Sequence, residues 1–385
     1  MEKVFLAGGL RTPIALRRGG LSKIRPEAFG AAVIRALLSR TRCPEGSLSG
    51  VIAGNAVGTG GNIARLMALM AGLPVEVPAF TIDMQCASAA AAISTAYAKI
   101  RSGEGGCYIA GGMESASLQP LRVYARQDDR SAETEAAGVS GGYYTAQFAP
   151  DDLRQQTMLY GAESVIEAEQ VTKEEMDAWV LRSHQRAARA AEREIFSDVI
   201  LPIGPCAEDE GVHTRISQRL LDRLPPVLGK GTLLNAANAC RINDGAAFVL
   251  LVSGSFAEKY GLPVQAELIG TAAFGCNPSE SPRGAQRTAE ALLHRQGLSF
   301  GDLSAIEFNE AFAVIDVLFA RRYPELVERY NRFGGALAYG HPYGASGAIL
   351  LLQLLKSLDA AGGGLGLLSI AGAGGLGEAI LIKKA

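Results

Sequence analysis

The chain has 385 residues, with 37 Lys and Arg against 39 Asp and Glu, which gives a net charge of −2. This balance argues against nucleic acid and an acidic membrane surface as partners. The 48% apolar and 20% charged residues exclude a disordered chain. No apolar run reaches the roughly 18 residues of a membrane-spanning helix.

Apolar strands and helices alternate from the start of the chain. Strands are predicted at 4–7, 51–55 and 107–110, and helices at 28–38 and 86–100. The same succession returns later, with strands at 266–270, 305–308 and 366–370 and helices at 285–294 and 344–355. The match extends to single residues, because 86–90 (CASAA) aligns with 344–348 (GASGA). Such a repeat predicts an α/β fold of two similar halves.

The stretch 119–244 interrupts the repeat and is more polar. It holds one clear helix, which begins with the capping box Thr172-Lys173-Glu174-Glu175 and runs to about Glu194. We expect this stretch to be an inserted loop domain over the cleft between the halves. The predicted domains are an N-terminal half at 1–118, completed by about 245–264, the insertion at 119–244 and a C-terminal half at 265–385.

The helices predicted at 86–100 and 344–355 are rich in Ala, Gly and Ser. Small side chains allow close helix packing, so we expect both helices near the middle of the molecule. Their N-termini carry the positive ends of the helix dipoles. A reactive group at each N-terminus would therefore share one cleft.

Three side chains are candidates for catalysis. Cys86 stands at the start of a helix, where the dipole lowers a thiol pKa, as a nucleophile requires. Asn309 directly follows a predicted strand, and His341 lies in a glycine-flanked loop before the matching helix. Lone cysteines and histidines are usually structural. Spacing alone therefore leaves the catalytic and the structural interpretation open.

The cysteines indicate a reducing compartment. None of the six forms a C-x-x-C pair or a Cys/His cluster with zinc spacing: Cys43, Cys86, Cys107, Cys206, Cys240 and Cys276. Scattered cysteines in a large, core-rich chain are typical of free thiols. We expect a cytoplasmic protein without a metal site.

Seven segments in a fixed order carry a resemblance to a known family. They are Arg11-Thr12-Pro13, 61–65 (GNIAR), Cys86-Ala87-Ser88, 111–115 (GGMES), 243–246 (NDGA), 309–313 (NEAFA) and Gly340-His341-Pro342. Each is weak alone, but together the chain resembles the thiolase family of the thiolase/ketosynthase superfamily. The resemblance implies a thiolase-like layered fold of two α/β halves with an inserted loop domain that helps to bind coenzyme A. It also implies a homodimer or homotetramer.

The resemblance further implies catalytic roles. Cys86 would take the acyl group from an acyl-CoA thioester, and His341 would activate its thiol. Asn309 would hold a water or donate to the oxyanion site of the second substrate. Backbone N–H groups of Cys86, Ala373 and Gly374 would form another oxyanion hole. Coenzyme A enters as the thioester substrate, and no metal, redox or permanently bound cofactor is implied.

Ala371 is a departure from the family pattern. Thiolases carry a second cysteine at this place in the tail motif, where it is the acid and base of condensation. Acetyl-CoA acetyltransferase-like Claisen condensation and thiolysis remains the expected activity. The alanine leaves open decarboxylative condensation, on acyl-CoA or acyl-carrier-protein thioesters, and acyl transfer to an oxygen or nitrogen nucleophile. A non-catalytic, CoA-binding or scaffolding subunit is the alternative from another class.

The expected coenzyme A channel also departs from the pattern. The usual serine aligns with Cys240, the small residue after it with Arg241, and the usual histidine lies near Thr157. The candidate substrate-binding residues are therefore Cys240, Arg241, Leu159 and Tyr160.

Overall fold

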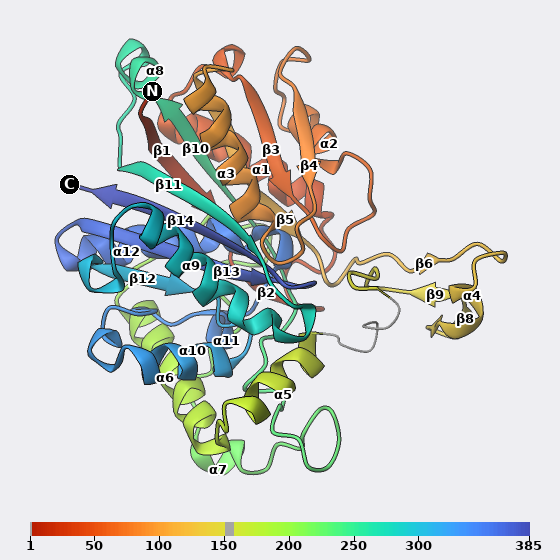
Figure 1. Cartoon of the computed structure of the whole chain (residues 1–385). Helices are drawn as coiled ribbons and strands as arrows, with labels where there is room; N and C mark the ends of the chain where they lie inside the picture. Colours follow the sequence, from red (N-terminus) through yellow and green to blue (C-terminus); the bar gives the residue numbers. More distant parts are fainter. Residues whose placement is uncertain (1, 151–157) are drawn as a thin grey trace.

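The computed structural model describes residues 2–150 and 158–385, and a mixed sheet forms its centre (Figure 1). The strands of this sheet are β1 (Val4–Arg11), β2 (Ala15–Leu16), β3 (Gly50–Gly54), β4 (Ala79–Ile82), β5 (Cys107–Glu114), β10 (Asn243–Ser253), β11 (Ala266–Gly275), β12 (Ala305–Phe308), β13 (Gly364–Gly372) and β14 (Leu376–Lys384). Their order is β12-β13-β14-β11-β1-β10-β5-β3-β4, with β2 beside β10.

The two ends of this sheet have the same topology. In β1-β10-β5-β3 the first two pairs are antiparallel and the last is parallel. The succession β11-β14-β13-β12 has the same pairings. The predicted α/β class with two repeated halves is therefore confirmed. The halves are nevertheless joined in one sheet, because β1 pairs antiparallel with β11 from Val4↔Leu268 to Leu6↔Ala266.

Helices pack on both faces of the sheet and between its two halves. The helices outside the insertion are α1 (Pro26–Thr41), α2 (Ile63–Met70), α3 (Ser88–Ser102), α8 (Gly254–Tyr260), α9 (Gly284–Arg295), α10 (Ala313–Arg322), α11 (Ala336–Tyr339) and α12 (Ser346–Ala361). None of the helices in the described part of the chain is both long and apolar enough to span a membrane.

Three apolar clusters show the layering. One joins α1 and α2 to one face of the N-terminal strands, and another joins α9 and α10 to one face of the C-terminal strands. Between them, α3 and α12 pack with each other and with residues of both half-sheets. A Cβ atom on Gly347 of α12 would lie 2.3 Å from the backbone nitrogen of Ala90 of α3. The predicted close packing of two small-residue helices is thus present at the centre.

The insertion divides into an arm and a packed part. Its helices are α4 (Arg130–Glu133), α5 (Met158–Ala168), α6 (Lys173–Glu192) and α7 (Gln218–Leu221). The capping box predicted at Thr172 and Glu175 is present at the start of α6. The short strands β6 (Arg122–Val123), β7 (Glu135–Ala136), β8 (Val139–Ser140) and β9 (Gly142–Tyr143) form an arm with α4 that extends away from the body (Figure 1).

The prediction that the insertion as a whole covers the cleft is wrong for this arm. Its two-residue strands are largely exposed, and the body leaves Val123 of β6 and Val139 of β8 uncovered. The packed part is anchored at Asp209. Its carboxylate accepts hydrogen bonds from both terminal nitrogens of the buried Arg11 of β1, at 2.6 and 2.7 Å. A bidentate pair of this kind fixes orientation as well as distance.

Glu307 of β12 makes the stability of the fold depend on pH. Its side chain is buried, accepts a hydrogen bond from Ser357 of α12 at 2.6 Å, and leaves Oε2 without a partner among the described residues. Burial raises the pKa of Glu307 from 4.5 to about 8. The folded state therefore keeps a proton that the unfolded chain has already lost. The free energy of unfolding therefore falls as the pH rises from 4.5 to about 8, by about 1.4 kcal/mol per pH unit.

Glu307→Gln removes this titration. We expect the variant to match the wild type near pH 5 and to be more stable by several kcal/mol near pH 9, as measured by urea unfolding at both pH values. Glu45→Gln on an exposed turn is the control and should leave the wild-type pH dependence unchanged. Equal stability differences at both pH values would contradict the prediction.

Candidate active site

Cys86 lies on a tight turn before α3, two residues ahead of the first helical residue, Ser88. The Ser88 hydroxyl accepts the Met84 N–H at 2.8 Å and donates to the Gln85 carbonyl at 2.5 Å. Gln85 adopts the left-handed conformation, with φ of 53°. A local hydrogen-bond pair and one strained residue thus fix the direction of the cysteine.

Burial dominates the chemistry of the Cys86 thiol. The residue is only 7% exposed, and desolvation raises the pKa of Cys86 to about 12, although backbone hydrogen bonds from Ala373 and from Cys86 itself lower it. The expectation that the helix terminus lowers this pKa is therefore wrong, because loss of solvent outweighs the helix dipole. The thiol is protonated at neutral pH and needs a base. The oxyanion-hole role expected for the Gly374 N–H stays a prediction.

His341 and Asn309 are neighbours in the buried centre. The Nε2 atom of His341 lies 3.3 Å from Nδ2 of Asn309, and Nδ1 lies 2.5 Å from the Ser346 hydroxyl. That hydroxyl also donates to the Pro342 carbonyl at 3.0 Å, so it accepts from Nδ1–H. The network therefore assigns the proton to Nδ1 and leaves a lone pair on Nε2. Burial lowers the pKa of His341 to about 3, so the imidazole is neutral.

One extended segment holds the catalytic loops together. The Cys240 N–H donates to the Ala311 carbonyl at 2.9 Å, and the Arg241 carbonyl accepts the His341 N–H at 2.9 Å. Ala311 belongs to the loop of Asn309. The structure thus brings the two candidate residues Asn309 and His341 together from separate elements. No hydrogen bond joins His341 to the Cys86 thiol in the described ranges, and apo sites often tighten only with substrate.

Glu114 at the end of β5 is a central residue that the sequence prediction missed. Its buried carboxylate accepts from the Asn55 side chain at 2.8 Å and from the N–H groups of Ala56 and Gly344 at 2.9 and 3.0 Å. Burial raises the pKa of Glu114 to about 7. The residue ties β5 to the loop of His341. Its one sequence signal is its place in the segment 111–115.

Glu310 acts in a similar way beside Asn309. It accepts from the Ser183 hydroxyl at 2.6 Å and from the Asn331 side chain at 3.0 Å. These contacts fix the loop after β12 to α6 and to the segment before α11. We therefore interpret Glu310 as a structural residue of the site.

Ala371 lies buried near the end of β13. It belongs to the apolar cluster of the C-terminal half, which also includes Ala311 and Phe312. The methyl group of Ala371 can act neither as an acid nor as a base. Any proton transfer on this side must come from another residue.

A cavity of about 170 Å³ adjoins the segment that carries Cys240. It is lined by His184, His213, Ile216, Leu220, Leu221, Leu224, Ala236, Ala237, Arg241 and Leu337. The Arg241 guanidinium donates to the Gly211 carbonyl at 2.6 Å and lies 2.9 Å from Nε2 of His213. The cavity therefore joins apolar walls with one fixed cation.

The other candidate binding residues lie on α5. Leu159 is partly buried against the cluster around α9 and α10, whereas Tyr160 is 50% exposed. Their role in binding stays a prediction, and Thr157 lies outside the described residues.

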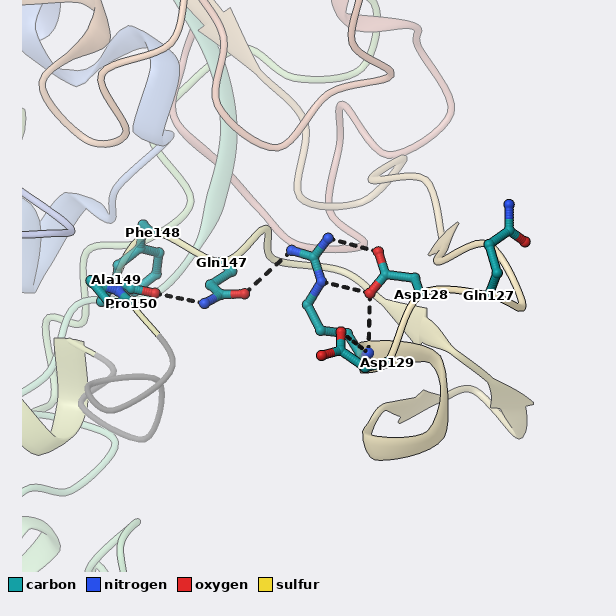
Figure 2. Close-up of a pocket in the computed structure, with 8 residues that line it drawn as sticks. Gln127, Asp128, Asp129, Gln147, Phe148, Ala149 and Pro150 are labelled. Carbon is teal, nitrogen blue, oxygen red and sulfur yellow. Dashed lines mark hydrogen bonds and ion pairs between the residues drawn. The ribbon is translucent and has the colours of Figure 1, made fainter.

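A wider hollow of about 830 Å³ opens at the base of the arm. Figure 2 shows Asp128 and Asp129 on one side and Gln147, Phe148, Ala149 and Pro150 on the other. Arg130 is held here by Asp128 at 2.7 Å. None of Cys86, Asn309 and His341 lines this hollow.

Comparison with known proteins agrees with this geometry. Residues 4–255 match the family model of the thiolase N-terminal domain, and residues 262–384 match that of the thiolase C-terminal domain. The chain belongs to the thiolase family. The predicted resemblance is thereby confirmed.

Relatives and solved structures cover the whole chain. The chain is 35% identical to a β-ketoadipyl-CoA thiolase of Pseudomonas aeruginosa, over 100% of this chain and 99% of the relative. It is 33% identical to a probable acetyl-CoA acyltransferase of Staphylococcus aureus, over 93% of each. The Bacillus anthracis acetyl-CoA acetyltransferase superposes with a TM-score of 0.93 at 29% identity, covering 100% of this chain and 99% of that chain. The Acat5 thiolase of Ascaris suum, solved in complex with coenzyme A, has a TM-score of 0.89 at 30% identity, with 100% of both chains covered.

Proposed function

We propose that this thiolase transfers acyl groups from acyl-CoA thioesters through an acyl-Cys86 intermediate, in Claisen condensation and thiolysis. The observation that supports this most is the surroundings of the thiol. Backbone hydrogen bonds from Cys86 and Ala373 meet at its sulfur, while His341 and Asn309 share a buried, neutral network.

In the proposed first half-reaction, His341 is the base for Cys86. Nε2 of His341 takes the thiol proton while the sulfur of Cys86 attacks the thioester carbonyl. The new C–S bond places negative charge on the former carbonyl oxygen, where the N–H groups of Cys86, Ala373 and Gly374 stabilise it. Each preorganised donor contributes about 10²–10³ in rate. Collapse of this intermediate releases the CoA sulfur and leaves acyl-Cys86.

The second half-reaction uses the other side of the site. The thioester carbonyl of a second acyl-CoA binds near Asn309 and His341, whose donors stabilise the enolate that forms when a base other than His341 removes the α-proton. The enolate carbon attacks acyl-Cys86, and the C–S bond to Cys86 breaks to give a 3-oxoacyl thioester. Thiolysis is the reverse, with a CoA thiol as the nucleophile.

Coenzyme A would enter past the cavity beside Cys240. Its apolar walls suit a pantetheine chain, and the Arg241 cation suits the phosphates. Leu159 and Tyr160 would contact the acyl part or the pantetheine. The Ascaris thiolase in complex with coenzyme A supports this substrate class.

Intact-protein mass spectrometry tests the proposal. The protein is incubated with acetyl-, longer acyl- and malonyl-CoA, and any adduct is mapped by peptide analysis. We expect a stoichiometric acyl adduct on Cys86 that free CoA releases. No adduct with any donor would contradict the proposal and favour a non-catalytic, CoA-binding subunit.

Decarboxylative condensation is the second candidate, and Ala371 is the observation that favours it. Loss of carbon dioxide would generate the carbanion without a proton-abstracting cysteine. Acyl transfer to oxygen or nitrogen needs no such cysteine either, since His341 can activate the nucleophile. Release of acyl-Cys86 by malonyl-CoA but not by acetyl-CoA would support decarboxylation, while release only by an alcohol or amine would support the other transfer.

We propose that the chain forms a homodimer or homotetramer through the free edge of the sheet. The end strand β4 exposes Phe80, and the adjoining α2 exposes Leu66 and Leu69. An apolar edge strand left open to solvent is a liability that a second copy would remove.

Phe80→Asp places a charge at this edge. We expect the variant to be monomeric by light scattering during size-exclusion chromatography, at a concentration where the wild type is dimeric or larger. Val264→Asp is the matched control, because Val264 is exposed elsewhere on the surface. An unchanged mass for Phe80→Asp would contradict the assignment of this edge.

A further inference from the structure

Condensation without decarboxylation needs a group that removes a proton from carbon, and Ala371 cannot do so. We infer that Cys240 is this acid and base. The inference rests on the proposed function, because it needs acyl-Cys86 as the electrophile. Cys240 stands in the extended segment that contacts both the loop of Asn309 and the loop of His341. It is far in sequence from the tail motif that contains Ala371.

The backbone fixes Cys240 next to both loops. Its own N–H donates to Ala311 in the Asn309 loop, and the next carbonyl accepts from His341, both at 2.9 Å. Two isolated bridges, Ala239↔Phe312 and Ile242↔His341, frame the residue. Cys240 and its neighbour Arg241 thus make the backbone contacts to the loops of Asn309 and His341.

The Cys240 side chain is shielded from much of the solvent. Cys240 is partly exposed and packs on the cluster that contains Ala371, Ala311 and Phe312. Burial raises the pKa of the Cys240 thiol, the charge of Cys86 raises it further, and Arg241 lowers it. The two thiols therefore share one electrostatic neighbourhood. Burial raises the pKa of Tyr343, and the charges of Cys240 and Cys86 raise it further.

The proton balance is complete without a further reactant. When acyl-Cys86 forms, the Cys240 thiol gives its proton to the departing CoA sulfur and becomes a thiolate, while His341 holds the proton from Cys86. The Cys240 thiolate then takes a proton from the α-carbon of the second thioester. The resulting enolate attacks acyl-Cys86, the C–S bond breaks, and the Cys86 sulfur regains its proton from His341. Both thiols end protonated.

Cys276 provides a matched control. It is also partly exposed, and its N–H donates to the Gly375 carbonyl in the tail at 2.6 Å. The charges that act on its thiol are those of Arg287 and Glu280, not that of Cys86. Cys276 is therefore a cysteine of similar exposure near the tail that does not face the nucleophile.

Two readouts separate the half-reactions. The first is acetylation of Cys86 by acetyl-CoA, followed by rapid-quench mass spectrometry. The second is exchange of the acetyl-CoA methyl hydrogens in D₂O, which needs the carbon base. A CoA thiolate leaves readily without an acid, but a carbon acid does not ionise without a base. Cys240→Ala and Cys240→Ser should therefore lose exchange by at least about 100-fold while acetylation changes by less than about 10-fold.

The outcomes are distinct. Retained acetylation in both Cys240 variants shows that they are folded, and Cys276→Ser should keep both activities. Exchange in Cys240→Ala within about threefold of the wild type would overturn the role of Cys240, as would a wild type that is acetylated but shows no exchange at all. A wild type that is never acetylated would overturn the proposed function itself, together with this inference.

Discussion

Cys86→Ala should abolish acyl transfer, with a loss of roughly 10⁴-fold or more in turnover. The thiol is the one nucleophile to which the backbone of Ala373 is directed, and an alanine methyl group cannot form a thioester. The variant should also show no acyl adduct by mass spectrometry. Because Cys86 is a small, buried residue, its replacement by alanine should cost little stability.

Binding must be measured beside activity in this variant. Coenzyme A should bind Cys86→Ala within a few-fold of the wild type by calorimetry, since the cavity at Arg241 is not altered. Cys206→Ser is a suitable control, because Cys206 is equally buried but lies beside Glu210. Turnover above about 1% of the wild type in Cys86→Ala would exclude an acyl-Cys86 intermediate.

The sequence alone was enough for the repeated architecture. The strand predicted at 305–308 coincides with β12, and the capping box at Thr172 starts α6 as expected. These features depend on residues close in sequence, namely apolar periodicity, capping side chains and glycines at strand ends. Asn309 and His341 could each be named as candidates from the sequence, but the contact between them could not be predicted, because one loop follows β12 and the other precedes α12 in the same half.

Other features depend on contacts that no local pattern records. The pairing of β1 with β11 joins residues far apart in sequence, so a single sheet rather than two was not foreseen. Glu114 is central only because two loops, far apart in sequence, turn their donors toward one carboxylate. The direction of the Cys86 pKa shift was wrong for the same reason, since desolvation is a sum over the whole surroundings of the thiol.

These shifts together describe a catalytic pair that holds no charge at rest. Burial favours the thiol at Cys86 and the neutral imidazole at His341. Proton transfer between them creates two opposite charges at once, and their attraction in a buried site offsets the cost of forming each charge alone. The ion pair therefore forms with the attack on substrate instead of existing before it.

The pH dependence of Cys86 acylation should report this neutral pair. The pKa of His341 is lowered to about 3 and that of Cys86 is raised to about 12. His341 becomes protonated only below the first value, and Cys86 ionises only above the second. In a Glu114→Gln variant, which removes the titration of Glu114 near pH 7, the acylation rate measured by rapid-quench mass spectrometry should therefore be flat between about pH 5 and 9. A bell-shaped profile inside this range would indicate a preformed ion pair and contradict the neutral assignment.

His341→Ala should slow the same step by about 10²–10⁴-fold, because the thiol then has no base. Ser346→Ala is the sharper comparison, since it removes the acceptor of Nδ1–H but keeps the ring. We expect a smaller loss in Ser346→Ala, because the ring is still present but its tautomer and orientation are no longer fixed. Acylation in His341→Ala within about tenfold of the wild type would mean that another group activates Cys86. In that case the 3.3 Å contact between His341 and Asn309 would serve the second half-reaction only.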